Sequence, residues 1–229
     1  MATPVTRAMI LAAGRGERLR PLTDHVPKPL LEVAGKPLIV RHLESLAAAG
    51  IRDVVINVGH LGDAIMQALG QNWRGLRITY SDEREGRLET GGALVRALPL
   101  LGNSPFLLVN GDICTDFPWA QLCQPSLARV HLVLVPNPMQ HPQGDFALSA
   151  GMVALAGEER HNYAGIARLD PELLRGFPEQ SAPLAPWLRQ WIAAGVVEGT
   201  LYQGKWTDVG TPDRLRAAQR DWAEAAHGL

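Results

Sequence analysis

Cysteine and lysine are scarce in this chain of 229 residues. The two cysteines, Cys114 and Cys123, have a spacing that matches no zinc site and are too few for a disulfide framework, so we expect two inert thiols. No apolar run approaches the roughly 20 residues that cross a bilayer. The N-terminus also lacks the basic and apolar segments of a secretion signal. These absences predict a cytoplasmic protein.

An excess of positive charge is also lacking, because the formal net charge is −1. That balance argues against general binding to nucleic acid, which needs many cationic side chains on one surface. The charge is nevertheless uneven, since residues 1–31 contain five Arg or Lys residues against two acidic ones. We therefore expect a small polyanion as partner, and neither nucleic acid nor a membrane.

The pattern of apolar residues over the first two thirds of the chain predicts an α/β fold. Apolar and β-branched runs predict strands at residues 7–13, 53–58, 76–80, 105–109 and 131–135. Helical spacing predicts helices at residues 37–49, 63–69 and 91–98. Strands that alternate with helices imply βαβ units, and hence a mainly parallel sheet flanked by helices.

The last third of the chain is less regular. Residues 146–149 and 153–156 flank a glycine turn and predict a hairpin, residues 184–194 a helix and residues 196–202 a strand. Thr211 followed by Pro212 is a helix start, because threonine caps and proline suits the first turn, and that helix runs to about residue 226. No linker is evident, so we expect a single domain over residues 1–229 with two parts, about 1–137 and about 138–229, on one sheet.

A glycine-rich segment follows the first predicted strand and reads LAAGRGER over residues 11–18. Its small residues let a flat ring approach the backbone, and Gly14 and Gly16 leave N–H groups open to phosphate oxygens. Arg15 and Arg18 add charge-assisted hydrogen bonds. The P-loop pattern is absent, and GxGxxG fails because residue 19 is leucine. The segment favours phosphate binding, although by itself it also suits a plain turn with solvated arginines.

A lysine held between two prolines follows the glycine-rich segment. Pro27 and Pro29 fix the backbone on either side of Lys28, one of only three lysines in the chain. A flexible side chain on a stiff base can aim an ammonium at a phosphate. An exposed loop lysine is the alternative. The position behind a glycine-rich loop favours a functional interpretation.

Taken together, these motifs resemble the sugar-1-phosphate nucleotidyltransferase family. The matching segments are LAAGRGERLRPLT at 11–23, PKPL at 27–30, GKPLI at 35–39, ETGG at 89–92, LVNGD at 108–112 and WTDVGT at 206–211. The resemblance covers about residues 7–222. It implies the Rossmann-like nucleotide-diphospho-sugar transferase fold, a nucleoside triphosphate substrate and Mg²⁺. The first part would bind the nucleotide and the second the sugar.

The resemblance is strongest to bacterial uridylyltransferases of peptidoglycan recycling, which join UTP to N-acetylmuramate α-1-phosphate and release pyrophosphate. Guanylyltransferases that act on mannose or heptose phosphate are the alternative, and a non-catalytic nucleotide-sugar regulator ranks last. Neither a left-handed β-helix nor a long helical extension follows residue 222, which predicts a monomer.

The family pattern also implies a role for particular residues. Arg15 and Lys28 would be catalytic, and Asp112 and Asp208 would bind Mg²⁺. The implied nucleotide-binding set is Leu11, Ala12, Ala13, Gly14, Gly16, Arg18, Glu89 and Gly91. The implied sugar-binding set is Asn110, Gly144, Asp145, Tyr163 and Gly165. From the residues alone, Asp112 also suits a turn, Asp208 a strand end and Tyr163 core packing, so these alternatives stay open.

Overall fold

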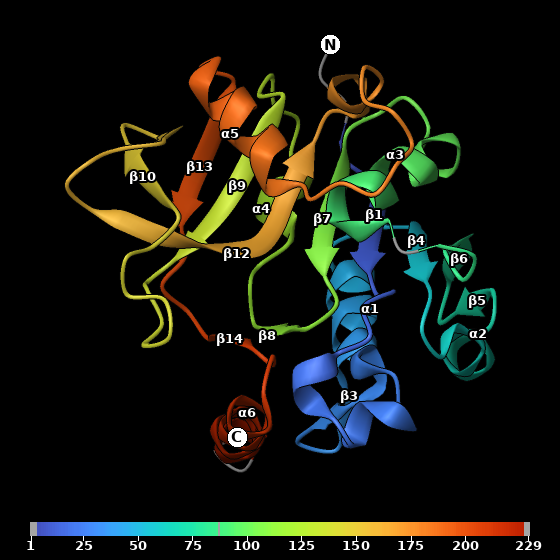
Figure 1. Ribbon diagram of the computed structural model, residues 1–229. Coiled ribbons are helices and arrows are strands. Elements are labelled where there is room, and N and C mark those ends of the chain that lie inside the picture. The colour runs from blue at the N-terminus through green and yellow to red at the C-terminus, as the bar shows by residue number, and fades with distance from the viewer. Residues whose placement is uncertain (1–3, 87, 227–229) are drawn as a thin grey trace.

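The computed structural model describes residues 4–86 and 88–226. The main sheet is made of ten strands: β1 (Arg7–Leu11), β4 (Asp53–Val58), β5 (Asn72–Trp73), β6 (Leu76–Asp82), β7 (Phe106–Asn110), β9 (Val130–Val135), β10 (Phe146–Ser149), β11 (Met152–Ala154), β12 (Arg160–Leu169) and β13 (Val197–Leu201). Their order is β10-β11-β13-β9-β12-β7-β1-β4-β6-β5 (Figure 1). The helices are α1 (Leu38–Ala48), α2 (Gly62–Leu69), α3 (Glu89–Leu101), α4 (Ala120–Cys123), α5 (Ala185–Ala193) and α6 (Pro212–Ala226).

Several short elements lie outside the main sheet. They are the strands β2 (Glu32–Val33), β3 (Lys36–Pro37), β8 (Ile113–Thr115) and β14 (Trp206–Asp208), and the 3₁₀ turns η1 (Glu17–Leu19), η2 (Leu22–Asp24), η3 (Lys28–Leu30) and η4 (Pro171–Leu174). β14 pairs antiparallel with β8, and β2 pairs with β3. The turns η1, η2 and η3 follow β1, so the chain folds into tight bends from the end of the glycine-rich segment onward.

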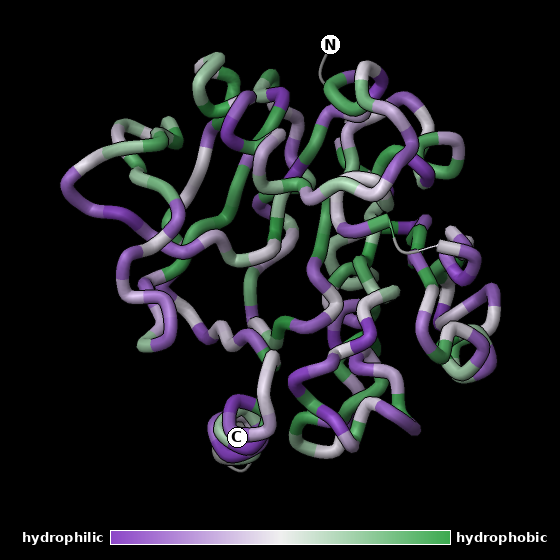
Figure 2. Tube along the Cα trace, in the orientation of Figure 1, coloured by the Kyte–Doolittle hydropathy of each residue, from purple (hydrophilic) through white to green (hydrophobic). Residues whose placement is uncertain are grey.

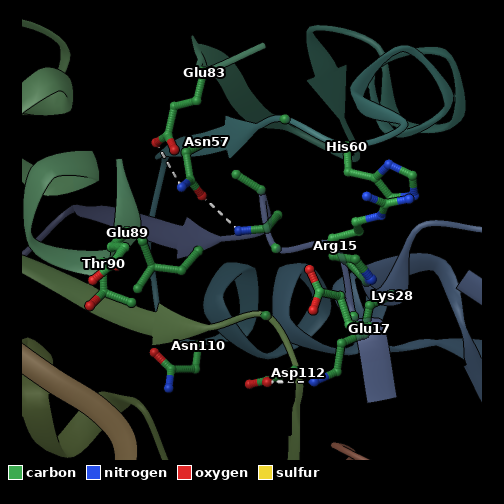
Figure 3. A pocket seen from close by; sticks show the side chains of 18 of the residues that line it. Arg15, Glu17, Lys28, Asn57, His60, Glu83, Glu89, Thr90, Asn110 and Asp112 are labelled. Carbon is green, nitrogen blue, oxygen red and sulfur yellow. Dashed lines mark hydrogen bonds and ion pairs between the residues drawn. The ribbon is translucent and has the colours of Figure 1, made fainter. Parts of the chain in front are cut away.

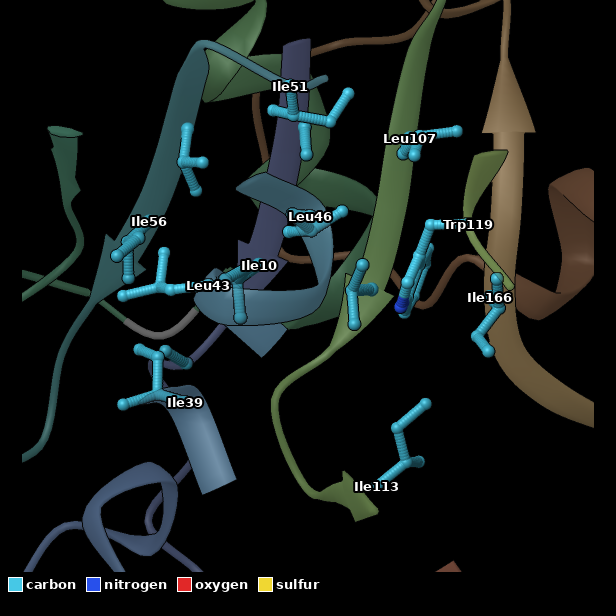
Figure 4. Close-up of a cluster of buried hydrophobic side chains, with 14 of the residues drawn as sticks. Ile10, Ile39, Leu43, Leu46, Ile51, Ile56, Leu107, Ile113, Trp119 and Ile166 are labelled. Carbon is cyan, nitrogen blue, oxygen red and sulfur yellow. The ribbon is translucent and has the colours of Figure 1, made fainter. Parts of the chain in front are cut away.

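Four neighbouring strands, β7-β1-β4-β6, are parallel, as the apolar runs of the first half predict, and β13 also pairs parallel with β9. In β1 the side chains alternate, so that Ala8 and Ile10 face one side and Met9 the other. Residues from α1 and α2 pack on the first side, and residues from α3 and α5 on the second. Figure 4 shows Leu43 and Leu46 of α1 packed against the strands. The predicted α/β architecture is confirmed.

The central strand β12 is absent from our sequence-based prediction, and it makes the sheet mixed. It runs antiparallel to both β7 and β9. Its first residues are polar and Gly165 interrupts it, which hides the apolar alternation that marks a strand. The predicted hairpin is confirmed as β10 and β11, and β10 also pairs with β12. The strands β10, β11, β13, β9 and β12 therefore close into a ring.

The C-terminal helix α6 lies apart from the main sheet, beside the segment that follows β1 (Figure 1). It begins at Pro212 as predicted, and the Thr211 hydroxyl accepts a hydrogen bond from the amide of Arg214. Its exterior is largely hydrophilic (Figure 2), but Leu215 and Ala218 are buried in a small cluster with Leu19. The helix therefore packs against the end of the glycine-rich segment and stabilises its position. No helix in the described part of the chain is long and apolar enough to cross a membrane.

Candidate active site

A cavity of about 930 Å³ opens at the carboxyl ends of the parallel strands. Its walls come from the segments that follow β1, β4, β6 and β7, together with the start of α3. Ligands gather at this edge of open α/β sheets because strand ends and helix starts converge there. The volume lies within the range of small-molecule sites, roughly 300–1,000 Å³.

The glycine-rich segment forms one wall of the cavity. Gly16 has a positive φ of 66°, and its carbonyl accepts a hydrogen bond from the Thr23 hydroxyl at 2.9 Å. A Cβ on Gly16 would lie 2.9 Å from Thr23 and 3.3 Å from the Lys28 stem. Glycine is required there because the turn folds back on itself and lets Lys28 pack against its backbone.

A buried polar network holds the backbone at the start of this wall. The Asn57 side chain accepts a hydrogen bond from the Ala12 amide at 2.6 Å and donates one to the Glu83 carboxylate at 2.9 Å. Burial raises the pKa of Glu83, and its hydrogen bond from Asn57 opposes that rise. Figure 3 shows Glu83 and Asn57 together at one end of the cavity, away from Lys28 and Asp112. The network fixes the backbone where a flat ring would approach it.

Lys28 and Asp112 form an ion pair at the other end of the cavity. Lys28 Nζ lies 2.6 Å from Asp112 Oδ2 (Figure 3). The lysine side chain is only 10% exposed, because the fold of the glycine-rich segment covers its stem. Lys28 lines the cavity, and the partner of its ammonium there is a carboxylate.

A second carboxylate, Asp208, lies beside this pair. Its position follows from the β8–β14 ladder and from a 2.8 Å hydrogen bond between the Val209 amide and the Asp112 carbonyl. Arg214 Nη1 lies 2.7 Å from Asp208 Oδ2. Burial raises the pKa of Asp208, and the negative charge of Asp112 raises it further, whereas Arg214 and Lys28 oppose the rise. Two carboxylates and several cations therefore share one corner of the site.

The Asp208 carboxylate also has an oxygen without a partner. Oδ1 is buried and has no hydrogen bond within the described residues. A buried carboxylate oxygen without a partner is unfavourable, so it indicates a position suited to a cation. Protein ligands alone do not build a closed metal site, since no cluster of three or more His, Cys, Asp or Glu side chains occurs over residues 4–86 and 88–226.

Most of the residues expected to bind nucleotide line this cavity. Those that do so are Leu11, Ala12, Ala13, Gly14, Gly16, Arg18 and Glu89. The cavity is also lined by the catalytic candidates Arg15 and Lys28, the metal-binding candidate Asp112 and the sugar-binding candidate Asn110. Gly91 is not in the lining, because its amide donates to the Ala182 carbonyl at 2.8 Å and the segment before α5 covers it. The absence of a side chain at Gly91 allows close packing against Trp187 and does not expose the backbone to a ligand.

The residues expected to bind sugar fall into two groups. Gly165 touches the cavity residue Asn110, since a Cβ there would lie 2.6 Å from Asn110 Nδ2. Asn110 itself lines the cavity, whereas Gly144, Asp145 and Tyr163 lie outside its lining. There Asp145 Oδ2 accepts from the Tyr163 amide at 2.8 Å and Gly144 packs on Arg160. The Tyr163 hydroxyl is buried without a partner among the described residues, and burial raises its pKa.

Sequence reasoning missed several residues of the cavity. Asn57, His60, Glu83 and Arg84 all line it. His60 Nε2 lies 2.8 Å from the Thr23 carbonyl and so ties the segment after β4 to the one after β1. The available signal was position, because Asn57 lies near the carboxyl end of a predicted strand and the other three follow shortly after one. Arg214 gave no such signal, since it lies within a helix remote in sequence.

The family model for nucleotidyl transferases matches residues 7–144. The chain belongs to the nucleotidyl transferase family. It is 47% identical over 223 residues to the N-acetylmuramate alpha-1-phosphate uridylyltransferase of Neisseria meningitidis serogroup B, covering 93% of this chain and 96% of that relative. It is 43% identical over 232 residues to the mannose-1-phosphate guanyltransferase of Aspergillus fumigatus, covering 90% of this chain but 61% of that relative. The predicted membership of the family is therefore confirmed.

Solved structures give the same fold for this nucleotidyl transferase. A UDP-glucose pyrophosphorylase complexed with UDP-glucose superposes with a TM-score of 0.79, at 18% identity over 96% of this chain and 99% of the other. At that identity the similarity concerns the fold alone. The nucleotide-diphospho-sugar transferase fold expected from the motifs is confirmed.

Proposed function

We propose that this protein transfers a uridylyl group from UTP to N-acetylmuramate α-1-phosphate and releases pyrophosphate. The observation that carries the reaction class is the corner where Lys28, Asp112 and Asp208 meet beside a glycine-rich segment. The choice of UTP and the muramate phosphate is supported by the near full-length similarity to the Neisseria relative. The compartment and the monomeric state stay predictions, as does a role in peptidoglycan recycling.

We infer that Mg²⁺ binds between Asp112 and Asp208. The unpartnered, buried Asp208 Oδ1 fits this assignment, and two carboxylates completed by phosphate oxygens and waters form a set that Mg²⁺ accepts. When bound, the ion neutralises charge on the phosphates and polarises the phosphorus–oxygen bonds. Arg214 orients Asp208 from the side opposite the unpartnered oxygen.

The side chains of this protein position the two phosphates and balance their charge. Arg15 holds the outer phosphates of the triphosphate and stabilises pyrophosphate as it leaves. Lys28 neutralises charge at the α-phosphate while an oxygen of the sugar phosphate attacks that phosphorus. No general base is needed, because a phosphate monoester with a second pKa of about 6 is mostly ionised at neutral pH. Catalysis then rests on alignment and electrostatics, as in other phosphoryl transfers.

We assign the ring-binding end of the cavity to the wall held by Asn57 and Glu83. The small residues Ala12 and Ala13 leave room for a flat base there, and the Asn57 network keeps that backbone in place. Sugar binding falls to the side of Asn110 and Gly165, which contact each other at the edge of the same cavity.

The test is pyrophosphate release with Mg²⁺, using five nucleoside triphosphates against the α-1-phosphates of N-acetylmuramate, N-acetylglucosamine, mannose and glucose. We expect strong turnover only with UTP and the muramate phosphate. Best turnover with GTP and mannose α-1-phosphate would support guanylyl transfer instead. If the folded protein released no pyrophosphate with any pair of substrates, a non-catalytic regulator would be favoured.

Lys28→Ala tests the proposed catalytic role directly. Loss of an electrostatic donor of this kind lowers turnover by roughly 10²–10³. Lys36→Ala is a matched control, because Lys36 pairs with Glu44 outside the cavity. Near-normal turnover of a folded Lys28→Ala variant would contradict the role given to Lys28.

A further inference from the structure

The ammonium of Lys28 sits where a metal ion would meet Asp112. Its nitrogen is 2.6 Å from Oδ2, a close charge-assisted contact. The stem is held against Gly16, and Pro27 and Pro29 fix the backbone on either side. In the free protein, the Asp112 carboxylate is therefore already paired with a cationic side chain.

Asp208 has a different kind of cationic partner. Arg214 extends from helix α6, and its Nε also lies 3.4 Å from the Thr211 hydroxyl. Its guanidinium closes over Gly210, where a Cβ would lie 2.3 Å from Arg214 Nη2. Arg214 occupies only one oxygen of Asp208 and leaves the other without a partner. Arg214 is therefore a fixed partner of one Asp208 oxygen only.

We propose that Lys28 is a releasable internal counter-ion, which competes with the divalent cation for Asp112 until triphosphate draws the ammonium away. This inference rests on the proposed function, because it takes Asp112 as a metal ligand. Lys28 contacts Oδ2 of Asp112, and a divalent cation bound to the same carboxylate would lie close enough to the ammonium to repel it strongly. A lysine suits the role, since its flexible stem lets the ammonium move to phosphate oxygens of the arriving substrate.

The consequence is coupling between the cation and the nucleotide. If triphosphate removes the competing ammonium, it raises the affinity for the metal, and by linkage the metal raises the affinity for triphosphate by the same factor. The free protein should then bind divalent cations weakly. Lys28 would thus make the site assemble only when the nucleotide is present.

The first experiment measures Mn²⁺ binding to the free protein by the electron paramagnetic resonance signal of unbound Mn²⁺, without nucleotide or sugar phosphate. Lys28→Met removes the competing charge but keeps an apolar stem. We expect it to bind Mn²⁺ about fivefold or more tightly than the unchanged protein, the lower end of common coupling factors. Lys36→Met should leave Mn²⁺ affinity unchanged, and Asp112→Asn should abolish the tight binding of Lys28→Met when the two are combined.

The second experiment uses the unchanged protein and so does not depend on a variant that folds. The chain has three lysines, so ¹⁵N labelling of lysine gives three side-chain Nζ signals at most. Mg²⁺ should shift the Lys28 signal as it takes Asp112, while the signals of Lys36 and Lys205 stay in place. Titration with K⁺ at equal ionic strength controls for screening.

The proposal is overturned if Lys28→Met binds Mn²⁺ equally or more weakly, or if saturating Mg²⁺ leaves the Lys28 signal unmoved. Neither readout involves turnover. An inactive protein that shows both effects would refute the proposed function and leave the counter-ion intact. An active protein that shows neither effect would support the proposed function and refute the counter-ion role of Lys28.

Discussion

Replacement of Gly165 by alanine should disturb the site through Asn110. Gly165 lies in β12 at the irregularity where its pairing with β9 shifts between Tyr163 and Ile166, and its φ is +73°. A Cβ there would lie 2.6 Å from Asn110 Nδ2 and 2.9 Å from Asn110 Cβ. These separations are too short for ordinary contact, so Asn110 must move, and Asn110 lines the cavity.

The structure separates two contributions to the free energy of unfolding. Left-handed backbone costs a non-glycine residue roughly 1–2 kcal/mol. Overpacking adds about 1–3 kcal/mol. Gly151→Ala is a matched control, because its φ is +78° but nothing lies within 4 Å of the new Cβ. Gly151→Ala should therefore lose only about 1–2 kcal/mol, and Gly165→Ala about 2–5 kcal/mol.

Urea unfolding measures the loss of stability, and steady-state kinetics measures the KM for each substrate. Displacement of Asn110 removes its proposed hydrogen bond to the sugar phosphate, which is worth about 1 to 1.5 kcal/mol. The KM for the sugar phosphate should therefore rise about tenfold in Gly165→Ala. The KM for UTP should change less, since the base is assigned to the Asn57 and Glu83 end of the cavity, away from Asn110. If Gly165→Ala matched Gly151→Ala in both stability and KM, Asn110 would have no role in holding the sugar phosphate.

Two other perturbations probe the support of the site. Arg214→Met removes the partner of Asp208 and should raise the Mg²⁺ concentration for half-maximal activity, with a stability loss of about 1–2 kcal/mol, whereas Arg216→Met at an exposed pair should change neither. If Arg214→Met left the Mg²⁺ requirement unchanged, Arg214 would have no role in positioning Asp208 for the metal. Burial lowers the pKa of His42 from 6.5 to about 4, so the folded state resists protonation and stability falls as pH drops below 6.5. Unfolding in urea should show a loss of about 2 kcal/mol between pH 7 and pH 5, and His42→Gln should show a smaller loss. An equal loss in His42→Gln would assign the effect to other groups.

The parallel half of the fold was predictable because its signals are local. β1, β4 and β7 are short apolar runs bounded by polar or glycine residues, and such runs carry their own strand preference. The convergence of Arg15, Lys28 and Asp112 also follows, since each lies beyond the carboxyl end of a parallel strand. The closed ring of strands that includes β10 and β12 was not predictable, because pairing between distant strands leaves no local pattern.

The Asn57 network shows a second limit of local reasoning. Asn57 ends a buried strand, and a buried amide needs partners. Which partners it finds depends on the register of the sheet, where Asn57 lies opposite Leu11 on one side and Ser81 on the other. That register brings the Ala12 amide and Glu83 within reach. Sequence could indicate a polar role for Asn57 but could not name its partners.

Asp208 shows why α6 belongs to the site although it lies outside the cavity. The 95 residues between Asp112 and Asp208 give no indication that the two aspartates are close in space, and only the family motif suggested that they meet. In the structure they meet through a two-stranded ladder outside the main sheet. Such a ladder is marginal by itself. Its position therefore depends on α6, whose buried Leu215 packs with Leu19 of the glycine-rich segment and with Val209 beside Asp208. The same helix carries Arg214, so one element holds both the carboxylate and the loop that faces it.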